Sequence, residues 1–342
     1  MTEAIAKEYL FLHGHFDLPW QTIYFGGGTP SVLDPAQIHR LMHLFRKNGG
    51  ISDHAEVTLE ANPEDINEEN LLQWQLAGIN RLSIGVQTLN NETLALMNRK
   101  HSAEQSIDAV VESLKAGFNS VSIDLIFGGF HFSAEEWKNT LEWAFDCGAN
   151  HISAYGLTVE PRTTLQKQIA AGKIPTPPEE QMSEAYGYLF EEANRRGWDF
   201  YEISNLSKPN CRARHNSNYW LGKPYLGLGP SAHSFDGKNH RWWNVSDNKK
   251  YIQQANDKQF QPTDEWLNTA DLFNELLMTS LRKTEGINKA EAEKLLPGIW
   301  KKKEGDLLKW QNEKMIELNE NSIQLTLKGR LFADAITADL MV

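Results

Sequence analysis

The feature that most restricts the fold is an alternation of short β-rich runs with helical patterns between residue 21 and about residue 205. The runs that predict strands lie at 22–25, 56–60, 81–86, 121–126, 151–158 and 199–203. Glycines mark the ends of the helical patterns between them, at Gly78, Gly117, Gly148 and Gly197. Strands that alternate with helices at this spacing pair in parallel with right-handed crossovers. The sequence therefore predicts an α/β barrel or partial barrel, with its chemistry at the C-terminal ends of the strands.

Charge and cysteine content narrow the classes of function. The chain of 342 residues has a net charge of −11, which argues against a nucleic-acid surface or a polybasic membrane patch. No apolar run approaches the roughly 18 residues of a membrane span. Residues 1–12 have the pattern of an amphipathic helix rather than of a signal peptide, and two cysteines are too few for a disulfide framework. We therefore expect a cytoplasmic protein without nucleic-acid partners.

Polar groups follow five successive predicted strands. The first strand ends in three glycines, Gly26 to Gly28, whose lack of Cβ atoms lets backbone N–H groups approach a ligand closely. The other strand ends carry Glu60-Ala-Asn-Pro, Gln87-Thr, Asp124 and Tyr155, and Arg99 lies beyond the next turn. Each group alone is explained as well by a cap, a turn or a satisfied polar side chain. Together they predict a polar ligand at one mouth of the barrel.

Beyond the barrel, which we assign to residues 1–205, the chain changes character twice. Residues 206–261 form a connecting segment rich in glycine and aromatic residues, which we expect to be irregular. Residues 262–342 predict three helices, a hairpin near 319–322 and a last helix over 327–339, which together make a small winged-helix-like domain. Its balance of charges favours a packing role over DNA binding.

Several motifs in this order resemble the oxygen-independent coproporphyrinogen III oxidase-like branch of the radical S-adenosylmethionine (SAM) proteins. They are Ile23-Tyr-Phe-Gly-Gly-Gly-Thr-Pro30, Leu59-Glu-Ala-Asn-Pro63, Asn80-Arg-Leu-Ser-Ile-Gly-Val-Gln87, Met97-Asn-Arg99, Ile123-Asp-Leu-Ile126 and Gly227-Leu-Gly-Pro-Ser-Ala-His-Ser234. The resemblance implies a radical-SAM-type partial (β/α)6 barrel. It also implies a SAM site made by Gly27, Gly28, Thr29, Glu60, Gln87, Arg99 and Asp124.

Within that branch, His215-Asn216-Ser-Asn-Tyr219-Trp220 resembles the HNxxYW motif of the HemW haem chaperones. This resemblance implies that His215, Asn216, Tyr219 and Trp220 bind haem, which passes to acceptor proteins in the cytoplasm or at the membrane. From the residues alone, His215 is as well explained as a hydrogen-bonded loop residue. His233 on the same segment is a competing ligand.

The chain departs from the family where a 4Fe–4S cluster is expected. The family holds the cluster with three cysteines spaced CxxxCxxC, about 50 residues before the triple glycine, and here that position falls before Met1. Cys147 and Cys211 are 64 positions apart and cannot replace such a loop. A truncated chain that lacks the first barrel strand and a natural cluster-free homologue both explain this departure. We expect no metal ligands for a cluster in this chain, and the family's cofactors are then SAM, haem and a cluster whose ligands are absent.

Three functions follow from the resemblance. The first is a HemW-like haem chaperone that binds haem and, in the intact family, SAM and a 4Fe–4S cluster. The second is an oxygen-independent coproporphyrinogen III dehydrogenase-like radical SAM enzyme, in which a reduced cluster cleaves SAM. The third is a cluster-free remnant that binds neither ligand. The HNxxYW-like stretch favours the first function, and without cluster cysteines SAM cleavage is not expected.

Overall fold

The computed structural model describes residues 1–129, 133–161, 163–172 and 179–342. The chain forms two compact units, each described by itself below. The sheet unit contains Tyr24–Pro35 and Glu56–Ala213. The terminal unit contains Met1–Ile23, Ala36–Ala55 and Arg214–Val342, so its sequence is interrupted twice by the sheet unit.

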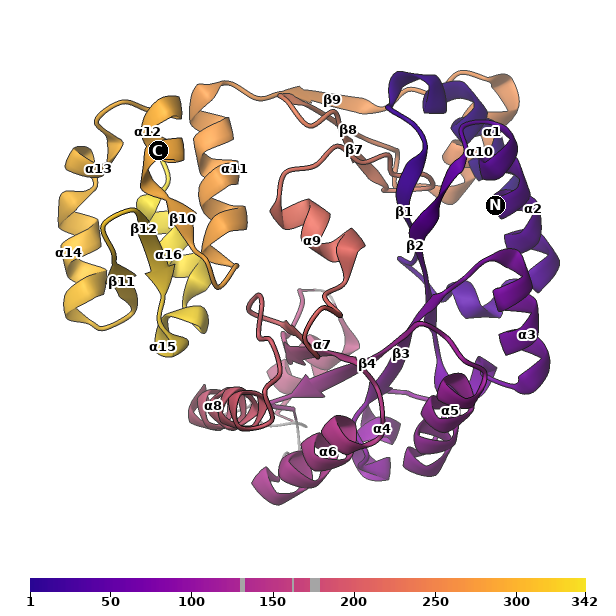
Figure 1. Ribbon diagram of the computed structural model, residues 1–342, viewed down its shortest axis with the longest axis horizontal. Helices are drawn as coiled ribbons and strands as arrows, with labels where there is room; N and C mark the ends of the chain where they lie inside the picture. Colours follow the sequence, from indigo (N-terminus) through magenta and orange to yellow (C-terminus); the bar gives the residue numbers. More distant parts are fainter. Residues whose placement is uncertain (130–132, 162, 173–178) are drawn as a thin grey trace. The chain divides into compact units, whose positions relative to one another are not determined.

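A six-stranded sheet in the order β1-β2-β3-β4-β5-β6 carries the alternation that the sequence predicts (Figure 1). Strands β2 to β5 pair in parallel, and β6 pairs antiparallel with β5. The strands are Trp20–Phe25, Ile51–Ala61, Arg81–Gln87, Ser120–Phe127, His151–Gly156 and Asn205–Ser207. The first five predicted strands and the α/β partial-barrel class are confirmed.

The sixth predicted strand, over 199–203, is wrong. Strand β6 begins only at Asn205. The reason is Glu202, whose buried carboxylate accepts hydrogen bonds from the backbone N–H of Ser204 at 3.1 Å and from Asn205 Nδ2 at 2.5 Å. These bonds turn the chain before it pairs with β5.

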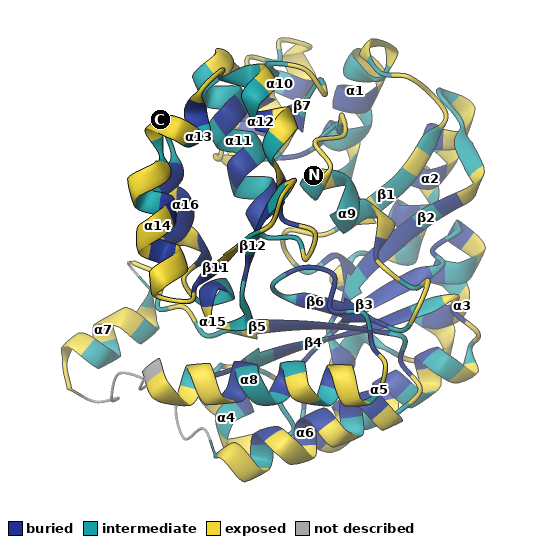
Figure 2. Ribbon diagram, turned by 60° about the vertical axis from the view of Figure 1, so that its left-hand side comes forward, coloured by how far each residue is buried: buried dark blue, intermediate teal, exposed yellow. Residues whose placement is uncertain are grey.

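The two faces of the sheet differ in polarity because side chains alternate along each strand. One face is apolar and fully buried, with Leu59, Leu82, Ile84, Ile123, Leu125 and Ile152. Helices α5 (Ala103–Lys115) and α6 (Ala134–Asp146) run along one side of β3 and β4 (Figure 1), and α5 contacts both strands. The other face carries Thr58, Glu60, Arg81, Ser83, Ser122 and Asp124. Figure 2 shows β3, β4 and β5 mainly in dark blue, and four residues of the polar face are buried as well: Thr58, Arg81, Ser83 and Ser122.

The remaining helices of the sheet unit are short or amphipathic. Ser102 begins α5 with a reciprocal capping box to Gln105, as the sequence predicts. Ser133 caps α6 through the backbone N–H of Glu136. The other helices are α3 (Glu68–Ala77), α4 (Asn91–Leu96), α7 (Thr164–Ala170) and α8 (Glu179–Arg195), with single turns at Pro30–Val32 and Pro63–Asp65.

In the terminal unit, the stretch expected to be irregular contains regular elements. They are α9 (Arg214–Trp220), β7 (His233–Phe235), β8 (His240–Trp243) and α10 (Asn248–Asp257), and β7, β8 and β9 (Thr263–Trp266) form an antiparallel sheet. The expectation of an irregular segment is therefore wrong. Backbone hydrogen bonds between the strands hold together residues whose sequence shows no clear period.

A buried carboxylate ties the N-terminus to this part of the unit. Helix α1 (Thr2–Leu12) presents Glu8, which is fully buried. Glu8 accepts hydrogen bonds from the backbone N–H of Gly229 at 2.9 Å, from Asn244 Nδ2 at 2.5 Å and from the Tyr251 hydroxyl. Burial raises the pKa of Glu8 despite these donors. A single-turn helix, His13–His15, and α2 (Pro35–Lys47) complete the N-terminal part.

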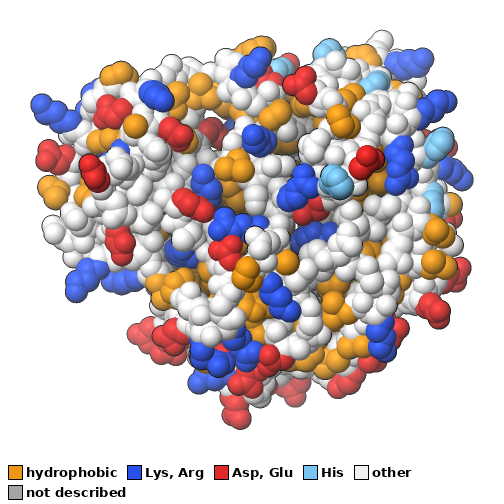
Figure 3. Space-filling model, viewed as in Figure 1, with side chains coloured by type: hydrophobic (Ala, Val, Ile, Leu, Met, Phe, Trp, Pro, Cys, Tyr) orange, Lys and Arg blue, Asp and Glu red, His pale blue; other side chains and the backbone are white. Residues whose placement is uncertain are grey.

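The C-terminal segment has the predicted hairpin and helices, except that the last helix, predicted over 327–339, is divided into α15 and α16 and that α13 was not predicted. Its strands form the antiparallel order β10-β12-β11, with Ile316 opposite Leu325 in the hairpin. The elements are α11 (Thr269–Leu281), β10 (Ile287–Asn288), α12 (Lys289–Leu295), α13 (Ile299–Lys302), α14 (Glu304–Asn312), β11 (Ile316–Leu318), β12 (Ser322–Leu325), α15 (Leu327–Arg330) and α16 (Ala333–Leu340). Acidic and basic side chains are interspersed on the face drawn in Figure 3.

Candidate functional site

The turn after β1 is held by Glu60 of β2. The Tyr24 hydroxyl donates to Glu60 Oε1 at 2.7 Å, and the backbone N–H of Gly27 donates to Oε2 at 3.2 Å. Shielding from water and the negative charges of Glu60 and Asp124 raise the pKa of Tyr24, so its hydroxyl stays a donor. The structure thus brings two of the predicted residues, Gly27 and Glu60, into direct contact.

Two of the three glycines of this turn are required, for different reasons. A Cβ on Gly26 would lie 2.4 Å from Tyr24 Cε1 and 2.8 Å from Glu60 Oε1, closer than atoms can pack. Gly27 has a φ of +81°, which disfavours any side chain. Nothing lies within 4 Å of a Cβ on Gly27 or Gly28, so the space in front of the turn is open. Thr29 lies between these glycines and the single-turn helix at Pro30–Val32.

Asp124 lies at the centre of the polar face. Ser83 Oγ donates to its two carboxylate oxygens at 3.0 and 2.9 Å, and Ser122 Oγ lies 3.4 Å from Oδ1. Burial raises the pKa of Asp124 to about 6. Hydrogen bonds from Ser153 and Ser83 and the positive charge of Arg81 act in the opposite direction and lower the pKa, but by less. Asp124 is therefore a carboxylate that a cationic or hydroxyl-bearing ligand would stabilise in its charged form.

Gln87 is the last residue of β3, and Arg99 lies just beyond the next helix, α4. Gln87 is buried in a left-handed conformation with φ of +67°, and the register of β3 on β4 shifts between Ile84 and Gln87. Such a conformation is rare in a residue other than glycine and concentrates at functional sites. Arg99 follows α4, and its guanidinium has no hydrogen bond or ion pair with any residue that the structure describes. It is available to a carboxylate.

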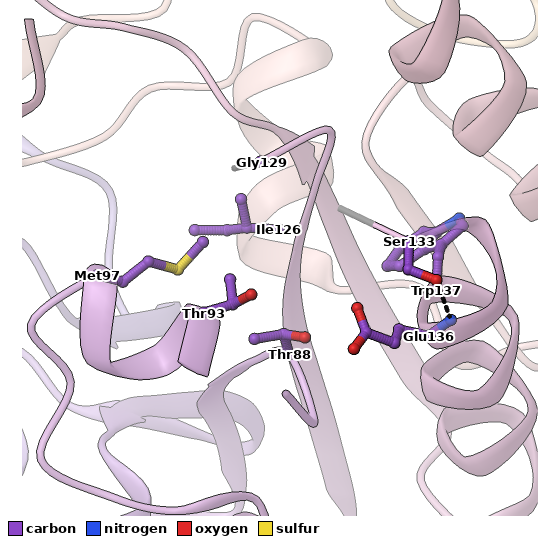
Figure 4. A pocket seen from close by; sticks show the side chains of 8 residues that line it. All are labelled: Thr88, Thr93, Met97, Ile126, Gly129, Ser133, Glu136 and Trp137. Atoms are coloured by element: carbon purple, nitrogen blue, oxygen red, sulfur yellow. Dashed lines mark hydrogen bonds between the residues drawn. The ribbon is translucent and has the colours of Figure 1, made fainter. Parts of the chain in front are cut away.

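A small cavity lies behind this rim, between the loops that follow β3 and β4. Figure 4 shows Thr88, Thr93 and Met97 on one side and Glu136 and Trp137 of α6 on the other. Its volume of about 20 Å³ suits a single water molecule rather than a cofactor. Gly129 closes it, and the next residues of this turn, Phe130 and His131, lie outside the described part of the chain.

In the terminal unit, α9 explains the spacing of the HNxxYW-like stretch. Residues four apart lie on the same face of a helix, which pairs His215 with Tyr219 and Asn216 with Trp220. His215 Nδ1 lies 2.8 Å from Thr22 Oγ1, and its Nε2 lies 3.2 Å from the Tyr219 hydroxyl. Both imidazole nitrogens are therefore hydrogen-bonded. Partial desolvation raises the pKa of Tyr219 to about 12, so this phenol keeps its proton.

The other two residues of the stretch differ in their surroundings. Trp220 has its indole Nε1 buried without a hydrogen-bond partner in the described residues, and the Arg282 guanidinium lies 6.0 Å from its ring centroid. The Asn216 amide makes no side-chain hydrogen bond within the same described part. Of these two groups, the Asn216 amide is available to a ligand, whereas the indole nitrogen of Trp220 is shielded.

Other histidines compete with His215 as metal ligands. His233 stacks on Trp243, with ring centroids 5.5 Å apart. His15 and His240 line a cavity of about 540 Å³, within the range of ligand pockets. His240 Nε2 lies 2.7 Å from Asp264 Oδ1, and its ring stacks between Trp242 and Trp266.

The cysteines do not fit a 4Fe–4S cluster. Cys147 Sγ donates to the carbonyl oxygen of Ala144 at 3.3 Å, and burial raises the pKa of its thiol, the opposite of what a thiolate ligand needs. Cys211 is also a free thiol. Among the described residues, no group of three or more His, Cys, Asp and Glu side chains is arranged to hold a metal ion.

Sequence reasoning missed several residues that shape the mouth. They are Tyr24, Arg81, Ser83 and Ser122, which position or perturb the predicted carboxylates. A signal was present in the alternation Arg81-x-Ser83-x-Gly85-x-Gln87, which places polar residues on one face of an otherwise apolar strand.

Family models match two parts of the chain. The Radical SAM superfamily model matches residues 2–144, and the HemN C-terminal domain model matches residues 267–332. The heme chaperone HemW of Bacillus subtilis is 34% identical over 98% of this chain and 87% of its own length. The heme chaperone HemW of Mycobacterium tuberculosis is 30% identical, over 99% of this chain and 85% of its own. The mitochondrial radical S-adenosyl methionine domain-containing protein 1 of Danio rerio is 31% identical.

A solved structure supports the same fold. The coproporphyrinogen III oxidase HemN of Escherichia coli superposes with a TM-score of 0.84, covering 99% of this chain and 82% of that one, at 24% identity. At that identity the match speaks for the fold alone. In the described part of the chain, we find no helix with the length and apolarity needed to traverse a bilayer.

Proposed function

The chain belongs to the HemW family of the radical SAM superfamily, and we propose that it is a haem chaperone that binds haem and passes it to acceptor proteins in the cytoplasm or at the membrane. The proposal is supported by two relatives named heme chaperone HemW, each at least 30% identical over almost the whole chain. Their names speak of haem and of a chaperone. The acceptors are part of our proposal.

The observation that carries the proposal is the setting of His215 on α9. A histidine that ligates a metal is usually oriented by a hydrogen bond at its other ring nitrogen. Thr22 Oγ1 supplies that bond at Nδ1, 2.8 Å away, and leaves Nε2 to face the Tyr219 hydroxyl. We infer that haem iron takes the place of this hydroxyl at Nε2. Asn216 and Trp220, on the same helix, then contact the macrocycle.

The mouth of the sheet unit is the proposed SAM site. The N–H-lined turn at Gly27, Gly28 and Thr29 and the carboxylate of Glu60 suit the methionine part of SAM. The guanidinium of Arg99, which has no partner among the described residues, suits a carboxylate, and Gln87 and Asp124 suit an amine or a ribose hydroxyl. With no cysteine set for a cluster in this chain, we propose binding here without SAM cleavage.

Haem titration tests the function. We expect haem added to the purified chain to give a Soret shift of the histidine-ligated type, with near-stoichiometric saturation. His215→Ala should weaken binding at least tenfold, whereas the exposed His43→Ala should leave it unchanged. The absence of a saturable Soret shift in the wild type would refute the proposed function.

The same titration distinguishes the candidate ligands. Loss of binding on His233→Ala alone would move the site to that residue. Loss on His240→Ala alone would move it to the 540 Å³ cavity that His240 lines. Unchanged binding in His215→Ala would remove His215 from the site.

A further inference from the structure

Two buried polar groups on neighbouring strands of the sheet unit have no hydrogen-bond partner among the residues that the structure describes. Arg81, at the start of β3, is 4% exposed, and its Nε makes no hydrogen bond. Thr58 of β2 is fully buried, and its Oγ1 makes none either. A buried donor without an acceptor is uncommon in proteins, and a buried charge without a counter-charge more so.

The register places these two groups side by side. Thr58 pairs with Arg81 in the parallel ladder of β2 and β3, and Arg81 pairs with Ser120 of β4. Paired residues of adjacent parallel strands project to the same face, about 4.8 Å apart. Both orphaned groups therefore belong to one layer of the polar face. Ser120 does not fill the gap, because its Oγ donates to Asn150 Oδ1 at 2.9 Å.

The acidic residues nearby do not neutralise Arg81 by contact. Asp124 and Glu60 lie further along the strands, and neither has an atom in ion-pair contact with Arg81 in the described part of the sheet unit. Asp124 is instead held by Ser83. His151 adds no positive charge, because burial and the neighbouring Arg81 hold its pKa well below the usual range.

We propose that Arg81 and Thr58 form a binding site for a small monovalent anion, such as a halide or a formate-sized carboxylate, on the polar face of the sheet. The guanidinium supplies charge and N–H donors, and the threonine hydroxyl supplies a further donor. A hydrogen bond to a charged group is stronger than one between neutral groups, so a small anion satisfies both orphans at once. The site lies one or two layers below the proposed SAM residues and does not depend on the haem proposal.

Thermal unfolding in chloride, formate and gluconate at equal ionic strength tests the site. We expect the midpoint of the wild type to rise with chloride or formate concentration and to stay flat in gluconate, which is too large to enter. Arg81→Met should abolish the anion dependence, and Thr58→Val should weaken the apparent affinity about tenfold. The exposed Arg40→Met is the matched control and should behave as the wild type.

A comparison of the stabilities of the wild type and Arg81→Met gives a second test. In gluconate, Arg81→Met should be at least as stable as the wild type, because it removes an unpaired buried charge. In chloride that order should reverse. A wild type that responds equally to gluconate, or an Arg81→Met variant with the wild-type chloride response, would overturn the proposal. If Arg81→Met does not fold, crystals in bromide decide: an anomalous peak between Thr58 and Arg81 supports the site, and water alone there refutes it.

Discussion

The mouth of the sheet unit and the α9 helix of the terminal unit bear the two proposed ligands, and they differ in how their polar groups are satisfied. At the mouth, Arg99 has no protein partner among the described residues and Asp124 has a raised pKa. A ligand can therefore supply the opposite charges and hydrogen bonds that these groups lack. On α9, both nitrogens of His215 are already hydrogen-bonded. A ligand at the mouth adds interactions, whereas haem iron on α9 must replace one.

The largest effect should come from the glycine turn. Gly26→Val places a side chain into Tyr24 and Glu60, and such overpacking costs about 1–3 kcal/mol or more. We expect a lower urea midpoint and no SAM binding by calorimetry.

Gly27→Val should also lose SAM binding. The φ of +81° at this position costs a residue with a side chain about 1–2 kcal/mol of backbone strain, which distorts the turn. Gly187→Ala on α8 is the control, since it lies outside the proposed site and its Cβ meets nothing within 4 Å. Equal SAM affinity in Gly26→Val and Gly187→Ala would place the ligand elsewhere.

A pH effect should follow from Asp124. Its pKa is about 6 in the folded chain against 3.8 for an ordinary Asp, so folding favours its protonated form. The resulting stabilisation is present below pH 4 and is lost as pH rises through 6, for a change of about 3 kcal/mol. Asp124→Asn should therefore gain stability relative to the wild type between pH 4 and pH 7, measured by urea unfolding. Parallel pH profiles of the two proteins would contradict the assignment.

The SAM affinity of the wild type should follow the same titration. A ligand amine or ribose hydroxyl interacts best with the ionised carboxylate, so binding should weaken below pH 6. Asp124→Asn should bind weakly at every pH between 5 and 8. Calorimetry across that range checks it, and a wild-type affinity independent of pH would show that Asp124 does not contact the ligand.

A smaller pair of effects should separate the roles of the two groups on His215. Thr22→Val removes the group that orients the imidazole and should weaken haem binding about 10-fold or more. Tyr219→Phe removes the hydroxyl that competes for Nε2 and should strengthen binding about 5-fold, the value of one net hydrogen bond. Soret titrations measure both. Weakening of similar size in the two variants would mean that Tyr219 contacts haem instead of blocking it.

In the last prediction, we expect iron and sulfide to leave the chain unchanged. Anaerobic reconstitution of this chain with iron and sulfide should leave no stoichiometric 4Fe–4S cluster, because Cys147 and Cys211 do not supply three neighbouring thiolates. Iron analysis measures this. Four irons per chain that are lost on Cys147→Ser or Cys211→Ser would contradict it.

The sequence predicted the strands of the sheet better than α9 for a physical reason. Five β-rich runs that end in glycine or a polar residue form strands, and parallel pairing then brings their ends to one edge. Helix α9 has only seven residues, and most of them are poor helix formers. Its sequence therefore shows no helical repeat of apolar residues from which it could be predicted. Ser83 and Ser122 were missed because a serine in an apolar run does not show which carboxylate it will contact. The prediction of a strand at 199–203 is wrong because the hydrogen bonds of a single side chain, Glu202, hold the backbone in a turn.

The Glu8 tie has a consequence for how the protein is made. Glu8 and Tyr251 are 243 residues apart, and the terminal unit is completed only by segments that follow residue 213. On the ribosome, the whole sheet unit emerges before residues 214–342 and can form as a local fold, while Glu8 on α1 still lacks the groups that donate hydrogen bonds to it. Until Tyr251 and Asn244 have been synthesised, Glu8 stays hydrated and charged. Helix α1 is thus translated long before the residues that hold it, and it is among the last elements to reach its final place.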